Sequence, residues 1–266
     1  MRQIKRMFRM HRIFVTQELK RMMEYKANFI VGIIAFLLGQ MTNILFIWII
    51  FRQIPDLMGF TVDQIIFIYG FSLIPKGIDH LFFDNLWMVG HFYVSRGEFD
   101  KYLTRPVNPL FHILVERLQI DAMGELIMGI ALLSTTIKKV NIQWSIMKVL
   151  LMLTAIFFAT FIYTGIKIAT AAIAFWTKKS GNITYMFYMV NDFAKYPVTI
   201  YNNTIKGIVT YVIPFAFTAF YPANYLLTGE NPLYNVGMTV VISVVWMAIG
   251  IAIWNRGIRV YESAGS

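Results

Sequence analysis

The stretch from residue 27 to residue 51 constrains the fold more than any other part of this sequence, because it contains no charged side chain. A helix needs about 20 consecutive apolar residues to cross the hydrocarbon core of a bilayer. Inside that core every backbone N–H and C=O group must be paired within the protein, and an α-helix pairs its own. The stretch therefore predicts a membrane-spanning helix and an all-α membrane protein.

The rest of the chain repeats this pattern. Of the 266 residues, 58% are hydrophobic and only 14% are charged, whereas a soluble domain has about 25% charged residues. We expect a single six-span transmembrane domain over residues 27–266, preceded by a separate segment at 1–26. The predicted spans are 27–51, 62–89, 118–137, 146–176, 183–200 and 233–255.

Residues 1–26 carry eight Lys and Arg side chains, with apolar residues between them at spacings of three and four. This spacing is typical of an amphipathic helix, which would lie on the cytoplasmic membrane surface as an interfacial helix. A disordered basic tail is the alternative. The net charge of +10 is concentrated in this segment and in short loops, which indicates cytoplasmic loops of a membrane protein rather than binding to nucleic acid.

Basic residues also orient the chain. The basic N-terminus is expected to stay in the cytoplasm, which places the loop at 90–117 inside and the loop at 52–61 outside. Arg256 and Arg259 then lie inside only if one of the segments 183–200 and 203–228 crosses the bilayer. Pro214 and Pro222, on either side of Tyr221, interrupt the second of these. We therefore expect 203–228 to be a re-entrant extracellular hairpin and both termini to be cytoplasmic.

Ionisable side chains in the second predicted span are candidate functional residues, because charges inside a membrane are costly. Lys76, Asp79, His80 and Asp84 stand at i, i+3, i+4 and i+8 and share one helical face. They could line a translocation path or contact another subunit. Alternatively, Lys76 pairs with Asp79 or His80 and only orients the helix. One histidine and two carboxylates are a weak signal for a metal, and we predict no metal site.

Charges in the other spans have simpler interpretations. Asp121 and Glu125 are expected at a solvated helix start, and Asp192 and Lys195 are expected to pair. Lys167 either reaches the interface or pairs with a carboxylate of a neighbouring helix. The sequence shows no catalytic constellation, no phosphate-binding glycine loop and no cysteine, so we expect neither an enzyme nor a cofactor in this chain.

The segment from Gly97 to Pro106 predicts a short helix at about 97–105 that projects into the cytoplasm. Gly97 acts as a hinge and Pro106 ends the helix. One face carries Phe99, Tyr102 and Leu103, and the charges of the segment are Glu98, Asp100, Lys101 and Arg105. Such a helix suits docking to a cytoplasmic partner. The alternative is an amphipathic loop on the lipid headgroups.

Three motifs in the sequence resemble one family. They are Gly-Glu-Phe-Asp-Lys-Tyr-Leu-Thr-Arg-Pro-Val-Asn-Pro at 97–109, Phe-Tyr-Pro-Ala at 220–223 followed by Leu-Leu-Thr-Gly at 226–229, and Trp254…Gly257…Tyr-Glu-Ser-Ala-Gly at 261–265. Together they resemble bacterial ABC-2-type permeases, the transmembrane subunits of ABC exporters, over nearly the whole chain. Lys76, Asp79 and His80 match no pattern of that family, so the resemblance assigns them no role.

The resemblance implies that the helix at 97–105 is a coupling helix. It also implies two separate cytoplasmic ATPase subunits, which bind ATP and Mg²⁺, and a second permease in a homodimer or heterodimer. The expected function is ATP-driven export of a hydrophobic or amphipathic cargo, such as a drug, lipid or peptide, across the bacterial cytoplasmic membrane. The alternatives are a secondary transporter driven by an ion gradient, which the charges at 76–84 favour, and a membrane scaffold.

Overall fold

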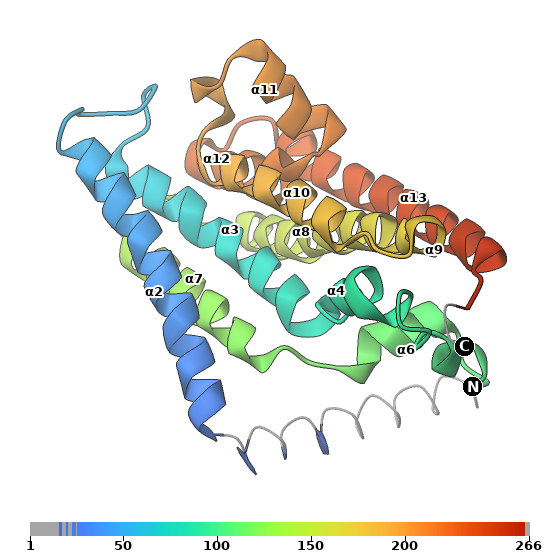
Figure 1. Ribbon diagram of the computed structural model, residues 1–266. Coiled ribbons are helices and arrows are strands. Elements are labelled where there is room, and N and C mark those ends of the chain that lie inside the picture. The colour runs from blue at the N-terminus through green and yellow to red at the C-terminus, as the bar shows by residue number, and fades with distance from the viewer. Residues whose placement is uncertain (1–15, 18–19, 21–22, 25, 264–266) are drawn as a thin grey trace.

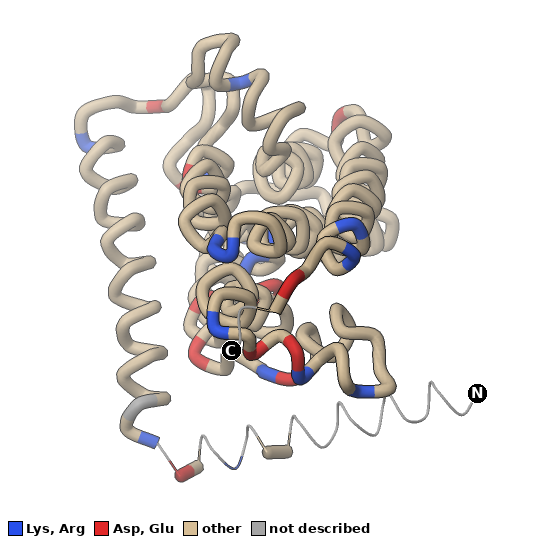
Figure 2. Tube along the Cα trace, turned by 45° about the vertical axis from the view of Figure 1, so that its right-hand side comes forward, with Lys and Arg blue, Asp and Glu red and all other residues tan. Residues whose placement is uncertain are grey.

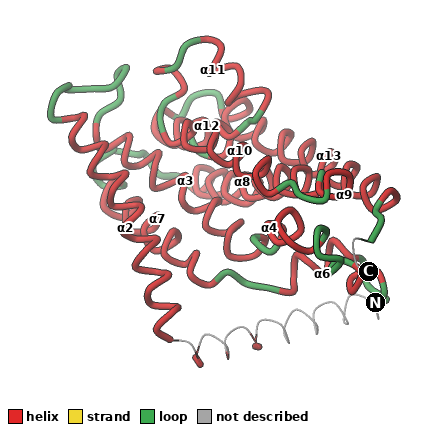
Figure 3. The backbone as a smooth tube through the Cα atoms, in the orientation of Figure 1, coloured by secondary structure: helices red, strands yellow, loops and turns green. Residues whose placement is uncertain are grey.

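A computed structural model describes residues 16–17, 20, 23–24 and 26–263. Helices and loops make up this part of the chain, and it contains no β-strand (Figure 3). The all-α prediction is therefore confirmed for the described residues. The predicted interfacial helix at 1–26 lies almost wholly outside them.

Four long apolar helices dominate the structure (Figure 1). They are α2 (Lys26–Phe51), α3 (Val62–Phe83), α8 (Ile146–Ala172) and α13 (Met238–Val260). A fifth apolar unit consists of α6 (Pro109–Glu116) and α7 (Met123–Thr136), joined by a 3-10 turn at Ile120–Ala122 and bent by 63°. The described residues thus hold four helices suited to crossing a membrane, or five if the bent pair counts as one span.

Shorter helices connect these units. They are α4 (Leu86–Met88), α5 (Asp100–Leu103), α9 (Ala174–Thr177), α10 (Gly181–Val190), α11 (Asn203–Gly207) and α12 (Phe220–Thr228).

Two predicted helices are shorter than expected. Instead of a span at 183–200, α10 and a 3-10 turn at Asn191–Lys195 end before Tyr196, which is extended with φ −116° and ψ 159°. Pro197 follows it and disfavours helical geometry at the residue before it. The predicted coupling helix at 97–105 is reduced to α5, because Gly97 has a left-handed φ of +72° that an α-helix does not accept.

Polar contacts between segments distant in sequence define two ends of the helix bundle. At one end, called the hairpin end after the segment at 203–228, the Lys139 ammonium lies 3.1 Å from Asp63, and Lys148 donates to the carbonyl of Leu226 at 3.3 Å. At the C-terminal end, Tyr261 donates to Asp100 at 2.9 Å. The first residue of α10 and the first residue of α13 therefore lie at opposite ends of the bundle. The segment between them, residues 181–232, consequently passes from one end to the other once.

The segment predicted as a re-entrant hairpin forms a helix, a break and a second helix, labelled α11 and α12 in Figure 1. α11 continues as a π-helix to Val212, the helical structure is interrupted at Pro214, and α12 runs back from Phe220. Pro222 does not break the hairpin, because it stands in the first turn of α12, where a missing N–H costs nothing. Tyr221 is buried and stacks on Phe217 with ring centroids 4.4 Å apart.

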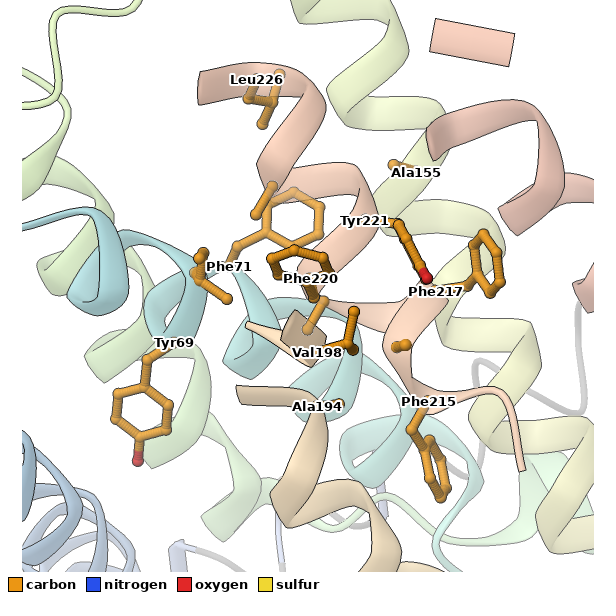
Figure 4. Packing of buried hydrophobic residues seen from close by; sticks show 14 of the residues in the cluster. Tyr69, Phe71, Ala155, Ala194, Val198, Phe215, Phe217, Phe220, Tyr221 and Leu226 are labelled. Carbon is orange, nitrogen blue, oxygen red and sulfur yellow. The ribbon is translucent and has the colours of Figure 1, made fainter. Parts of the chain in front are cut away.

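This hairpin packs into the main apolar core. Figure 4 shows Phe215, Phe217 and Phe220 among buried side chains of α3, α8 and the segment at 194–198. Phe220 also meets Phe60, before α3, in an edge-to-face contact at 5.9 Å. The hairpin is thus part of the packed helix bundle and covers the bundle at this end.

The helices α8 and α13 cross at two glycines. A Cβ atom on Gly165 would lie 2.7 Å from the carbonyl carbon of Trp246, and one on Gly250 would lie 2.6 Å from the carbonyl oxygen of Gly165. Small residues allow such close backbone approach where lipid provides no hydrophobic drive for helix association. This crossing fixes the positions of the ends of both helices. The segment at 97–106 lies next to those ends.

Candidate functional site

A buried lysine lies at the centre of the charged cluster within the helices. Lys167 of α8 has no exposed side-chain surface, and its Nζ lies 2.7 Å from Oδ2 of Asp79 in α3 and 2.9 Å from Oδ1 of Asp84, which caps the C-terminal end of α3. Asp79 also accepts hydrogen bonds from Thr164 at 2.7 Å and Tyr188 at 2.6 Å. Of the two sequence-based alternatives for Lys167, the structure shows pairing with carboxylates.

Glu125 of α7 forms the second half of the cluster. Its carboxylate is 1% exposed and lies 3.1 Å from Nζ of Lys76 and 2.9 Å from Nδ1 of His80. Two predictions are wrong here: Glu125 is not at a solvated helix start, and Lys76 pairs with neither Asp79 nor His80. The reason is close packing of α3 on α7, where a Cβ atom on Gly77 would lie 3.3 Å from the Cβ of Glu125.

The two halves form one cluster with an excess of negative charge. It contains the three carboxylates of Asp79, Asp84 and Glu125 and the two ammonium groups of Lys76 and Lys167, which leaves one negative charge when His80 is neutral. Buried ions are stable only when paired, because removal from water costs several kcal/mol per ion. Figure 2 shows the contrast with α2, which carries no charge between its two ends.

A cavity of about 340 Å³ opens beside this cluster. It lies between α2, α3 and α10. Its lining consists of Phe36, Lys76, His80, Asp84, Trp87, Tyr185, Tyr188, Met189, Asn191 and Asp192. Three of the four residues predicted for a translocation path or subunit contact thus face this cavity, while Asp79 lies behind them and is fully buried. Asp192 pairs with Lys195 at 3.3 Å, as predicted.

No group of three or more His, Cys, Asp or Glu side chains among the described residues could hold a metal ion. Asp79, His80 and Asp84, the three possible ligands in the sequence, are instead held by Lys167 and Glu125.

The segment at 97–106 is anchored by two aromatic side chains. Phe99 and Tyr102 are fully buried, whereas Glu98, Leu103, Arg105 and Pro106 are exposed. The prediction that Leu103 shares their face is therefore wrong. Phe99 packs edge-to-face on Phe175 of α9 at 4.9 Å and on Trp254 of α13 at 6.0 Å.

Hydrogen bonds fasten the same segment to its surroundings. Asp100 accepts from Tyr261 at 2.9 Å and from Ser263 at 2.5 Å, and Tyr102 donates to Glu116. Burial and the bond to Asp100 raise the pKa of Tyr261 to about 12, and burial followed by the bond to Glu116 raises the pKa of Tyr102. Both phenols therefore keep their protons, and can donate, throughout the physiological pH range.

Sequence reasoning missed the two hydroxyl groups, of Thr164 and Tyr188, that donate hydrogen bonds to Asp79. Thr164 stands three residues before Lys167 on the same helical face, a spacing that could have indicated a shared site. Tyr188 carries no such signal, because a tyrosine in an apolar stretch usually marks an interface or a core position.

The structure thus defines a multi-pass helical membrane protein with a buried charged cluster, a cavity beside it and an anchored polar segment at one end. Comparison with known families is more specific. Residues 37–265 match the model of the family described as ABC-2 family transporter protein, and the chain belongs to this family. No curated protein and no solved structure matches the chain. As a membrane component of an ABC-2 transporter, the chain belongs to a family whose permeases have no catalytic site. Membership of this family implies an ATPase partner.

Proposed function

We propose that this chain is the permease subunit of an ATP-driven exporter in the bacterial cytoplasmic membrane. Two such permeases, identical or different, would pair with two separate cytoplasmic ATPase subunits that bind ATP and Mg²⁺. Both termini and the segment at 97–106 would face the cytoplasm, and the hairpin at 203–228 would enter the membrane from outside as part of a six-span topology. The cargo would be hydrophobic or amphipathic.

One observation carries the proposal: the segment at 97–106 combines an exposed polar surface with a rigid aromatic anchor. A partner that moves Glu98, Leu103 and Arg105 also moves Phe99, which lies against Phe175 and Trp254 at the ends of α9 and α13. Because α13 packs tightly on α8 through glycine, displacement at this end would pass into the spans as a rigid-body shift. This is what coupling to an ATPase requires.

The test is to reconstitute the complex in vesicles with Glu98, Leu103 and Arg105 changed to alanine together. All three side chains are exposed, but Arg105 also contacts Nε2 of the buried His112 at 2.9 Å, so the Tm of the variant is compared with that of the unchanged chain before coupling is measured. Truncation of an interface residue at a binding hot spot costs at least about 2 kcal/mol, and about 1.4 kcal/mol corresponds to a tenfold change, so we expect at least a roughly tenfold loss of ATPase association and of ATP-dependent export. The matched control is the Lys138→Ala variant, exposed at the opposite end.

Asp100 is best tested separately, because it binds Tyr261 and Ser263 and its loss would loosen the anchor. If the triple variant couples ATP hydrolysis to export as well as the unchanged chain, the docking role is wrong. Transport that needs no ATPase and collapses with the proton gradient would instead support the secondary transporter.

A further inference from the structure

The cavity between α2, α3 and α10 has an aromatic wall. Trp87 meets Tyr188 edge-to-face at 5.3 Å, and His80 stacks on Tyr188 at 5.6 Å. Phe36 and Tyr185 add two more rings, and Met189 adds a polarizable thioether. The faces of aromatic rings attract cations, and large rings also supply apolar contact area. This wall therefore suits a ligand that is both hydrophobic and positively charged.

Asp84 provides an acceptor at the edge of the cavity. Its Oδ1 accepts from Lys167 at 2.9 Å, and no described residue donates a hydrogen bond to its Oδ2. The side chain is 26% exposed, while Lys167 behind it is fully buried. The free oxygen of this carboxylate is thus within reach of a ligand in the cavity.

The charge balance distinguishes a cation from an anion. The cluster of Asp79, Asp84, Glu125, Lys76 and Lys167 carries one excess negative charge when His80 is neutral. The cationic group on the cavity wall, Lys76, is already paired with Glu125 at 3.1 Å. A bound anion would increase the excess, whereas a bound monocation would remove it. A buried charge without a counter-ion is costly, and a lipophilic monocation has little hydration to lose when it supplies that counter-ion.

We infer that this cavity binds a lipophilic organic monocation, with Asp84 as its counter-ion and the rings of Trp87 and Tyr188 against its apolar part. The assignment of this ligand as cargo rests on the export function proposed above. The binding site itself rests only on the cavity and its charges. The site is open to a ligand dissolved in the membrane. It borders Phe36 of α2 and the helix α10, whose exposed side chains include Met186, at 68% exposure.

The direct test measures binding of radiolabelled tetraphenylphosphonium to the full chain in lipid nanodiscs, with empty nanodiscs to subtract partitioning into lipid. Tetraphenylborate has the same shape and the opposite charge. We expect saturable binding of the phosphonium and no competition by the borate. Equal binding of the two ions, or no saturable binding of either, would overturn the inference.

Two substitutions on one helix make a matched pair. Asp84→Asn should weaken phosphonium binding at least tenfold. Asp63→Asn is the control, since Asp63 is also an α3 aspartate paired with a lysine, at 3.1 Å, but lies about 30 Å away by helical rise. If Asp84→Asn lowers expression, Asp84→Glu must restore binding. Unchanged phosphonium affinity in Asp84→Asn would show that Asp84 is not the counter-ion.

This experiment separates the inference from the proposed function, because binding to the isolated permease needs no ATPase. ATP-dependent export of another cargo, with no phosphonium binding, would leave the export function intact and remove the cation site. Phosphonium binding that depends on Asp84, without ATP-dependent transport in the complex, would do the reverse.

Discussion

Lys167 shows how a single residue can determine the arrangement of three helices. It is fully buried on α8 and holds Asp79 and Asp84 of α3, while Asp79 also binds Tyr188 of α10. The sequence left two alternatives for this lysine, an interfacial position or a carboxylate partner, and the structure shows the partner. The sequence did not identify the partner, because the choice between the carboxylates on other helices depends on helix rotation and depth.

Replacement of Lys167 should therefore be severe. Lys167→Met leaves the buried carboxylate of Asp79 and the partly exposed one of Asp84 without this counter-ion, and removal of one member of a buried ion pair costs about 3–5 kcal/mol. Thermal unfolding of the detergent-solubilised protein should show a clearly lowered Tm.

The control is Lys139→Met, which removes an exposed lysine paired with Asp63. Exposed pairs contribute about 0–1 kcal/mol, so its Tm should be almost unchanged. Similar Tm values for the two variants would mean that the Lys167 cluster is hydrated and contributes little.

At the scale of elements, the longest spans could be predicted to within a few residues, because a long apolar stretch in lipid has only the helical solution. The segment at 27–51 became α2, and 146–176 became α8 with α9. Prediction was weaker where tertiary contacts override hydropathy. Leu103 was placed with Phe99 and Tyr102, but the left-handed Gly97 and the short α5 turn it outward.

Helix crossings could not be predicted at all, although their glycines are visible in the sequence. Only the structure shows that Gly165 and Gly250 meet, whereas Gly39 on α2 has no atom within 4 Å of where its Cβ would lie. Both Gly165 and Gly39 stand within apolar helices, so sequence context does not distinguish them.

This difference predicts opposite effects of one substitution. Gly165→Ala places a methyl group 2.7 Å from the backbone of Trp246, and such overpacking costs about 1–3 kcal/mol. Gly39→Ala meets nothing, and alanine favours a helix over glycine by about 1 kcal/mol.

Unfolding curves in detergent should therefore show a lower Tm for Gly165→Ala and an equal or higher Tm for Gly39→Ala. A Tm for Gly165→Ala at or above that of the unchanged protein would show that α8 and α13 do not touch here.

At the scale of the whole molecule, the contacts fix which loops share an end. The loops near Asp63, Lys139 and Leu226 meet at one end, and Asp100 meets Tyr261 at the other. The charge pattern of the sequence predicts the same grouping, with the second end in the cytoplasm. Lys138 and Lys139 run against that rule, and the ion pair of Lys139 with Asp63 explains how one of these charges is offset.

The absence of cysteine allows a direct test of this topology, because each single-cysteine variant carries one reactive thiol. Glu98, Lys138, Glu230 and Glu262 are all exposed. We expect a membrane-impermeant maleimide added to intact cells to label Lys138→Cys and Glu230→Cys. Glu98→Cys and Glu262→Cys should react only after the cells are opened.

The Glu230 and Glu262 positions decide the matter, since they flank α13. Reaction of both from the same side would mean that α13 does not cross the membrane. Reaction of Glu262→Cys from outside and Glu230→Cys from inside would mean that the segment at 203–228 crosses fully, so that the hairpin is not re-entrant. In that case the basic residues at the end of α13 would lie outside, and the charge rule used to orient the chain would fail at its C-terminus.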